Sequence, residues 1–257
     1  MRRHKRPQAA SAAPTIVYGA NPVLELLASA PQSVEQLWVA GEADAARVRA
    51  AAAEAGIAVE RADRATLDRL SGGGHHQGVA AQTRPFAYAD FEDILDAGAS
   101  LLVALDGLTD PQNLGAIVRS AEVLGAGGLV LPRDRSVGVT AAVVRASAGA
   151  TVHLPIAQVV NLVRALESAK AHGYWTVALA LDGSSTFQQL PELERALLVI
   201  GSEGKGARPL VLEACDFRVR IPQAGRVGSL NASVAAAIGL YALGERARAA
   251  DRKSRPR

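Results

Sequence analysis

The feature that most constrains the fold is a regular alternation of short apolar runs and helical patterns from Ser100 onward. The apolar runs that resemble buried strands are 100–106, 128–131, 151–154, 174–181, 196–201 and 216–221. Helices are predicted between most of them, at 111–124, 139–148 and 158–172, and an alanine-rich helix at 231–247. Strands that alternate with helices form a parallel sheet covered on both faces. The predicted fold class is therefore α/β, with ligands expected at the carboxyl ends of the strands.

The preceding residues predict a smaller α/β unit over 15–84. Helices are expected at 21–29, 43–56 and 64–70, and strands at 34–40, 57–62 and 77–83. These strands are few and short, which is typical of an accessory domain. Segment 85–98 is predicted to link this unit to the larger domain at 99–247.

Composition narrows the class of protein. Aromatic residues make up only 4% of the 257 residues, so the core must be aliphatic and rich in alanine. The single cysteine, Cys215, excludes a disulfide framework and a Cys-x-x-Cys metal cluster. A reducing cytoplasmic compartment is expected. The longest apolar stretch, 234–244, falls short of the roughly 18 residues of a membrane span, so no membrane partner is expected.

The formal net charge of +3 conceals basic ends on an acidic middle. Residues 1–14 carry a net +4, residues 245–257 another +4, and the middle of the chain a net −5. We expect a disordered basic arm at 1–14 and a basic tail at 248–257. Basic ends on a globular core indicate contact with nucleic acid, although they also serve solubility.

Two predicted strand ends are rich in polar residues and glycine. The first leads into DPQNLGAIVRSAEVLG (110–125), where Asp110 is a good helix N-cap and Pro111 suits the first helical position. Arg119 lies off the apolar face of this helix and shares its side with Gly115, which leaves room beside the guanidinium. By spacing alone, Arg119 is better explained as a surface residue beside Glu122.

The second strand end is LLVIGSEGKG (197–206). Its glycines lack the spacing of a phosphate-binding P-loop, and no dinucleotide fingerprint is present. A tight turn before a helix at 207–215 is the simplest structural explanation. A third glycine-bearing loop, within IPQAGRVGSLNASVAAAIGLY (221–241), leads to Ser229 and Asn231, both of which are good helix caps. Adjacent His75 and His76 have no ligand partners at metal-binding spacing.

Taken together, segments 110–125, 197–206 and 221–241 resemble the three motifs of the SpoU (TrmH-type) branch of the SPOUT methyltransferases. Their order and spacing agree over about residues 100–245. VYGANPVLELL (17–27) and HHQGVAA (75–81) extend the resemblance to enzymes that methylate a guanosine 2'-hydroxyl of 23S ribosomal RNA. It then covers nearly the whole chain except the basic ends.

The resemblance implies catalytic roles for five residues and a cofactor site built from three. The catalytic set is Asn113, Arg119, Glu203, Ser229 and Asn231. The residues implied to line a pocket for S-adenosylmethionine, largely through backbone groups, are Gly201, Ile221 and Leu230. No metal is expected. The family fold implies a trefoil knot in the carboxyl half, an N-terminal L30e-like RNA-binding domain, and a homodimer paired across the last helix.

The implied reaction is attack of a ribose 2'-hydroxyl on the sulfonium methyl group, in which positioning lowers the barrier. Arg119 would polarise the hydroxyl or hold the adjacent phosphate, because a guanidinium stays protonated and is a poor base. The other four residues would orient Arg119 and the ribose.

Three alternatives remain open from the sequence. Transfer RNA is the second candidate substrate. A non-catalytic RNA-binding or ribosome-assembly factor on the same fold would be expected to lack Arg119, Glu203 or Asn231, and all three are present. A nucleotide-dependent α/β enzyme is disfavoured by the missing phosphate motifs.

Overall fold

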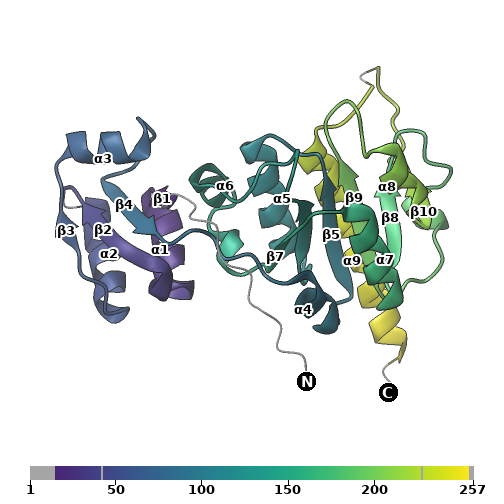
Figure 1. The fold of residues 1–257 in the computed structure, drawn as a ribbon, viewed down its shortest axis with the longest axis horizontal. Helices are drawn as coiled ribbons and strands as arrows, with labels where there is room; N and C mark the ends of the chain where they lie inside the picture. The colour runs from purple at the N-terminus through teal and green to yellow at the C-terminus, as the bar shows by residue number, and fades with distance from the viewer. Residues whose placement is uncertain (1–14, 42, 227, 255–257) are drawn as a thin grey trace. The chain divides into compact units, whose positions relative to one another are not determined.

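The computed structural model describes residues 15–41, 43–226 and 228–254, which form two compact units (Figure 1). The first unit ends at Ala87 and the second begins at Tyr88. The predicted arm 1–14 and the last three residues of the predicted tail lie outside the described residues.

Over its described residues, the first unit consists of a four-stranded sheet and three α-helices. Its elements are β1 (Thr15–Tyr18), α1 (Ala20–Ser29), a short 3-10 helix (Pro31–Ser33), β2 (Val34–Val39), α2 (Ala43–Glu54), β3 (Glu60–Arg61), α3 (Arg64–Ser71) and β4 (Val79–Thr83). The strand order is β1-β4-β2-β3, and β4 runs antiparallel to both of its neighbours. The sequence did not predict β1, because four residues give too short a pattern. The strand expected at 57–62 is only two residues long in the structure, where it is β3.

The paired histidines of the first unit face different environments. His76 is buried, and its Nδ1 accepts a hydrogen bond from the backbone N–H of Gly78 at 2.9 Å. Its Nε2 therefore carries the proton and donates to Asp68 at 3.1 Å. His75 is exposed. Next to them, the Gln77 side chain accepts a hydrogen bond from the backbone N–H of Ala20, so this loop is tied to the start of α1.

The second unit is a six-stranded, wholly parallel sheet, as predicted. Its strands are β5 (Leu101–Asp106), β6 (Leu129–Pro132), β7 (Ile156–Val159), β8 (Trp175–Leu179), β9 (Ala196–Gly201) and β10 (Phe217–Val219). Its helices are α4 (Phe91–Asp96), α5 (Pro111–Val123), α6 (Ala141–Ala146), α7 (Leu162–Ala171), α8 (Pro209–Glu213) and α9 (Ala232–Ser254), with 3-10 turns at Ala150–Val152 and Phe187–Gln189.

Helices cover both faces of this sheet, whose strand order is β10-β8-β9-β5-β6-β7. One face packs against α4, α7 and α8 through a buried cluster that includes Phe91, Leu102, Leu166, Leu197 and Val211. Alternate strand residues point the other way, and α5 and α9 pack together on that second face. Every residue of β5 and β9 is buried, so these two strands form the centre of the core.

Two predictions about the middle of the chain were wrong. Residues 151–154 are not a strand: a 3-10 turn covers Ala150–Val152, and the strand begins after Pro155, at Ile156. A short apolar run cannot be distinguished from other buried segments by pattern alone. Consequently the helix predicted at 158–172 begins only at Leu162, where Asn161 accepts a hydrogen bond from the backbone N–H of Arg164.

The predicted linker 85–98 contains α4, which Asp90 caps. Its side chains Phe91, Ile94 and Leu95 are buried in the second unit. Only the residues before Tyr88 fall in the first unit, so most of this segment belongs to the larger core. At the other end α9 continues to Ser254, seven residues beyond the predicted helix and into the predicted basic tail.

Candidate active site

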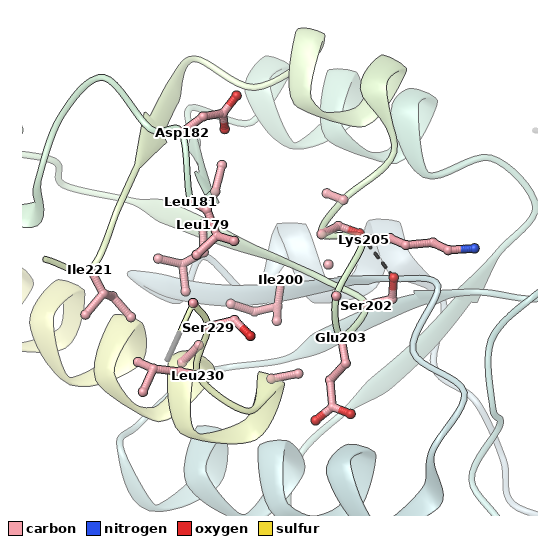
Figure 2. Close-up of a pocket in the computed structure, with 18 of the residues that line it drawn as sticks. Leu179, Leu181, Asp182, Ile200, Ser202, Glu203, Lys205, Ile221, Ser229 and Leu230 are labelled. Carbon is pink, nitrogen blue, oxygen red and sulfur yellow. Dashed lines mark hydrogen bonds between the residues drawn. The ribbon is translucent and has the colours of Figure 1, made fainter. Parts of the chain in front are cut away.

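A cavity of about 470 Å³ opens at the carboxyl ends of β8 and β9 (Figure 2). Its apolar wall includes Leu179, Leu181, Ile200, Ile221 and Leu230. The polar side chains at its edge are Asp182, Ser202, Glu203, Lys205, Gln223 and Ser229. Figure 2 shows Asp182 on one side of the apolar wall and Glu203 on the other. The three residues predicted for the cofactor pocket, Gly201, Ile221 and Leu230, all line this cavity.

The glycine loop after β9 folds tightly back on itself. Ser202 and Gly206 exchange two backbone hydrogen bonds of 3.1 and 2.9 Å, and Gly204 and Gly206 have positive φ angles of 75° and 67°. A Cβ atom on Gly201 would lie 1.9 Å from the backbone nitrogen of Ala207. The structure therefore explains Gly201 by close approach of its own loop, which the resemblance alone did not reveal.

An ion pair that the sequence analysis missed anchors this loop. The side chain of Asp106, at the end of β5, is completely buried. Its carboxylate accepts hydrogen bonds from the backbone N–H of Arg208 at 2.7 Å and from Nε of the same arginine at 2.8 Å. Nη2 of Arg208 lies 2.7 Å from Oδ1. The only sequence signal was a carboxylate at the end of an otherwise apolar strand, since its partner lies 102 residues away.

Three of the predicted catalytic side chains form a hydrogen-bonded triangle. Asn113 donates from Nδ2 to Oε1 of Glu203 at 3.1 Å. Asn231 donates to Oδ1 of Asn113 at 2.9 Å and to Oε1 of Glu203 at 2.5 Å. The three residues come from α5, the glycine loop and the segment before α9, so the triangle joins all three motifs at one point.

Asn231 also begins the last helix. Its Oδ1 accepts hydrogen bonds from the backbone N–H of Ser233 at 2.8 Å and from the Ser233 hydroxyl at 2.6 Å. The capping role and the site role therefore coexist in one side chain, whose amide nitrogen faces Glu203 and whose oxygen faces the helix. Ser229 is exposed at the cavity edge, and no hydrogen bond joins its hydroxyl to the described residues.

Arg119 lies apart from the triangle. Its side chain is exposed on α5 and has neither a hydrogen bond nor an ion pair with the part of the chain that the structure describes. None of the triangle residues orients it. The predicted room beside Gly115 is filled by α6, because a Cβ there would lie 2.4 Å from Cβ of Ala146 and 2.8 Å from the carbonyl oxygen of Val143. Gly115 thus serves helix packing and does not make space for Arg119.

Other reactive groups lie outside the cavity. Burial raises the pKa of the Cys215 thiol to about 11, which makes it a poor nucleophile at neutral pH. Within residues 15–41, 43–226 and 228–254, no group of three His, Cys, Asp or Glu side chains is arranged to hold a metal ion. Over the same residues, no helix is both long and apolar enough to cross a bilayer.

Comparison with known proteins places this site in a family. The sequence model of the SpoU rRNA methylase family matches residues 100–241, and that of the RNA 2'-O ribose methyltransferase substrate-binding domain matches residues 16–89. The chain therefore belongs to the SpoU family of RNA methyltransferases.

Similar proteins agree over most of the chain. An uncharacterized tRNA/rRNA methyltransferase of Mycolicibacterium vanbaalenii is 43% identical over 243 residues, which cover 91% of this chain and 77% of that protein. YacO of Bacillus subtilis, assigned to the TrmH family of tRNA/rRNA methyltransferases, is 41% identical over 88% of this chain and 93% of its own length.

Solved structures show the same fold. The SpoU methyltransferase AviRb from Streptomyces viridochromogenes, in complex with the cofactor AdoMet, has a TM-score of 0.79 at 25% identity and covers 96% of this chain and 95% of its own. An AdoMet-bound rRNA methyltransferase from Sinorhizobium meliloti has a TM-score of 0.77 at 26% identity and covers 90% and 87% of the two chains.

Proposed function

We propose that this protein transfers a methyl group from S-adenosylmethionine to a ribose 2'-hydroxyl in RNA. The observation that carries the proposal is the Asn113–Glu203–Asn231 triangle at the edge of an apolar cavity. For the target we propose a guanosine of 23S ribosomal RNA, an activity of the RlmB type, in the cytoplasm. Transfer RNA is the alternative substrate, because the names of the similar proteins include both RNAs.

The cavity suits a nucleoside cofactor. Ligand pockets combine a mostly apolar lining with a few placed polar groups, and this cavity has both. Leu179, Ile200 and Ile221 would hold an adenine ring by apolar contact, and exposed backbone groups of the glycine loop would bind its polar edge. The cofactor would supply an electrophilic methyl group on a sulfonium. Two AdoMet-bound relatives with this fold support the assignment.

The described residues then provide positioning for the acceptor. Oε1 of Glu203 receives the amide donors of Asn113 and Asn231, whereas Oε2 takes no hydrogen bond from the described residues. We assign Oε2 to accept a hydrogen bond from the attacking 2'-hydroxyl, which orients the oxygen lone pair, and to take up the hydroxyl proton as the O–CH3 bond forms and the C–S bond of the cofactor breaks. Two neutral donors on Oε1 fix the carboxylate in place, and such preorganisation lowers the barrier. Arg119, whose guanidinium has no partner among the described residues, would polarise the attacking hydroxyl or bind the adjacent phosphate.

The test of function is methyl transfer itself. Purified protein should transfer a labelled methyl group from S-adenosylmethionine to RNA from a strain that lacks the gene, and not to RNA from the parent strain, where the site is already modified. Mapping of 2'-O-methyl positions in that RNA distinguishes ribosomal from transfer RNA. The proposal is wrong if calorimetry finds no S-adenosylmethionine binding to folded protein, or if neither RNA gains a methyl group.

We also propose that the protein is a homodimer paired through α9. Val234, Ile238 and Tyr241 recur at helical spacing on α9 and are 47%, 38% and 59% exposed, which is unusual for three large apolar side chains on one helix face. Light scattering should give twice the 26.6 kDa mass of one chain at micromolar concentration. A mass of one chain under these conditions would contradict the proposal.

A trefoil knot is the proposed topology of the carboxyl half. Two contacts support it: Ser185, in the connection between β8 and β9, forms a bridge with Val219 of β10, and Arg246 of α9 donates to the carbonyl oxygens of Leu190 and Pro191 in the same connection. This connection therefore contacts the chain both before and after residues 220–231. We propose that the described part of this segment, residues 220–226 and 228–231, threads through the connection.

A further inference from the structure

Two arginines stand exposed in the loop that follows β6. The side chain of Arg133 is 61% exposed, and its Nε lies 3.9 Å from Oδ1 of Asp134, which is itself 73% exposed. Arg135 is exposed and has no ion pair or hydrogen bond to any residue that the structure describes. Neither side chain stabilises a buried part of the fold, and the reaction proposed above does not use them.

The loop lies beside the candidate site along the sheet edge. The strands β9, β5 and β6 are neighbours in that order, and all run parallel. The segment after β9 carries Glu203, the one after β5 leads to Asn113, and the one after β6 carries both arginines. Neighbouring strands are about 4.8 Å apart, so the arginine loop begins about 10 Å from the glycine loop. An RNA whose ribose reached Glu203 would bring adjoining phosphates to this edge.

Hydrogen bonds anchor the loop to the segment that leads to Asn113 and to the end of β7. The Ser136 hydroxyl donates to the carbonyl oxygen of Leu108 at 3.1 Å, and the Val137 N–H donates to the same oxygen at 2.8 Å. The Arg133 N–H donates to the carbonyl oxygen of Val159 at 2.8 Å.

Between these anchors Arg135 has a φ of 61°, in the left-handed region that non-glycine residues seldom occupy. Strained residues of this kind cluster at ligand-binding segments. A loop fixed in this way presents its guanidinium groups at little further cost in entropy.

We propose that Arg133 and Arg135 form a phosphate-binding site for the RNA backbone next to the target nucleotide. The proposal rests on RNA being the substrate, as proposed above. A guanidinium binds phosphate through a planar pair of N–H donors. Arg133 and Arg135 place two guanidinium groups within three residues, which suits an RNA chain that carries one negative charge per nucleotide. Asp134, between them, lowers the local positive charge and tunes the affinity.

Equilibrium binding of a fluorescein-labelled single-stranded RNA of mixed sequence tests the site without requiring methyl transfer. Each bound phosphate contributes about 0.7 to the slope of log K against log salt, which corresponds to about fivefold in affinity at 0.1 M monovalent salt. Arg133→Gln and Arg135→Gln should each lower the slope and the affinity by about these amounts. Arg135→Lys keeps the charge and should stay within about threefold of the wild type.

Asp134→Asn is the matched control variant, because it changes the charge of the loop in the opposite direction. It removes the carboxylate from the same loop and should tighten RNA binding. In methyl transfer, the glutamine variants should raise the KM for RNA and leave kcat and S-adenosylmethionine affinity unchanged, because neither arginine touches the cavity or the triangle.

Thermal melting checks that each variant is folded. Arg135→Gly serves as a further control, because glycine tolerates the positive φ angle and also removes the charge. That variant should melt at or above the wild-type temperature and still bind RNA more weakly. Wild-type affinity and salt slope in both glutamine variants would overturn the proposal. Weakened RNA binding in a protein that methylates no RNA would support this phosphate site and contradict the proposed function instead.

Discussion

At the scale of single residues, the site depends on side chains that each form hydrogen bonds with more than one partner. Asn231 caps α9 with its oxygen and holds Glu203 with its nitrogen, so substitution there would disturb both the helix and the site. Arg119 is the opposite case, because no described residue binds its side chain. Its removal is therefore the cleanest probe of chemistry without structural damage.

We expect Arg119→Ala to reduce methyl transfer on the order of a hundredfold or more, since a charged donor near the reacting oxygen contributes about 3–4 kcal/mol. S-adenosylmethionine affinity should stay within about threefold. Arg119→Lys should restore only part of the rate, because a point charge cannot replace the planar guanidinium. Single-turnover assays measure the rate, and circular dichroism checks folding. If both variants react at the wild-type rate, Arg119 is only a surface residue.

The Asp106–Arg208 pair predicts a coupled effect on stability and cofactor binding. Arg208→Ala leaves a fully buried carboxylate without its guanidinium, at a cost of about 3–5 kcal/mol in the free energy of unfolding. It also loosens the loop that forms the cavity wall, so S-adenosylmethionine should bind about tenfold more weakly. The double variant Asp106→Asn with Arg208→Ala removes the unpaired charge and should be more stable than Arg208→Ala alone. Urea unfolding and calorimetry measure the two effects, and simple additivity of the single variants would count against this pair.

At the scale of secondary-structure elements, close packing decides how the helices of the second unit meet. Gly115 lets α5 approach α6 where a Cβ atom would lie 2.8 and 2.9 Å from backbone atoms of Val143 and Ser147. On α9, the nearest atoms to a Cβ on Gly239 would be methyl groups of Leu198 and Leu179, at 2.9 and 3.3 Å. Backbone cannot move aside easily, whereas the end of a leucine side chain can rotate.

Gly115→Ala should therefore destabilise the protein by about 1–2 kcal/mol, because overpacking of about 1–3 kcal/mol outweighs a gain in helix propensity of about 1 kcal/mol. Gly239→Ala is the matched control, with the same chemical change at a more compliant contact, and should cost less or be neutral. Urea denaturation of the two variants gives the comparison. A greater destabilisation by Gly239→Ala would show that the α5–α6 contact is not the tighter one.

A polar cluster ties three elements together at the edge of the sheet and predicts a pH dependence. Asp216, just before β10, accepts hydrogen bonds from the backbone and hydroxyl of Thr176 in β8 at 2.9 and 2.8 Å and lies 2.7 Å from Nζ of Lys170 on α7. Partial burial opposes ionisation, but the bonds from Lys170 and Thr176 outweigh it and lower the pKa of Asp216.

A lowered pKa in the folded state stabilises the protein above the unfolded pKa of about 3.9, and this contribution disappears as the pH falls through the lower folded pKa. Asp216→Asn should thus be less stable than the wild type at pH 7, and the difference should shrink steadily below about pH 4. Unfolding free energies across this range test the sign. A constant difference down to pH 2 would mean that the charge of Asp216 contributes nothing.

At the scale of the whole molecule, positive charge is concentrated at the chain ends and the remainder is net negative. We expect the arm 1–14 to add affinity for RNA without choosing the target, because the arm would bind phosphates, which carry no sequence information. Deletion of residues 1–14 should lower the salt slope of RNA binding by about 0.7 for each phosphate that the arm binds. Mapping should find the same methylated nucleotide. A shifted position would show that the arm contributes to specificity.

The sequence by itself determined the parallel α/β class, most helices of the second unit and the three motifs, because each depends on local periodicity, capping residues or short spacing. It also pointed to the residues that line the cavity, Gly201, Ile221 and Leu230, through family resemblance. Their binding of the cofactor remains a prediction.

Only the tertiary structure decided what depends on residues distant in the chain. Asp106 pairs with a residue 102 positions away, and Glu203 meets Asn113 across 90 positions. The same applies to α4, which lay within an expected linker but buries Phe91 in the larger core, and to Gly115, whose missing side chain makes room for α6 rather than for Arg119. Local patterns record which residues prefer burial or a turn, but the partner that satisfies each one is chosen by packing of the whole chain.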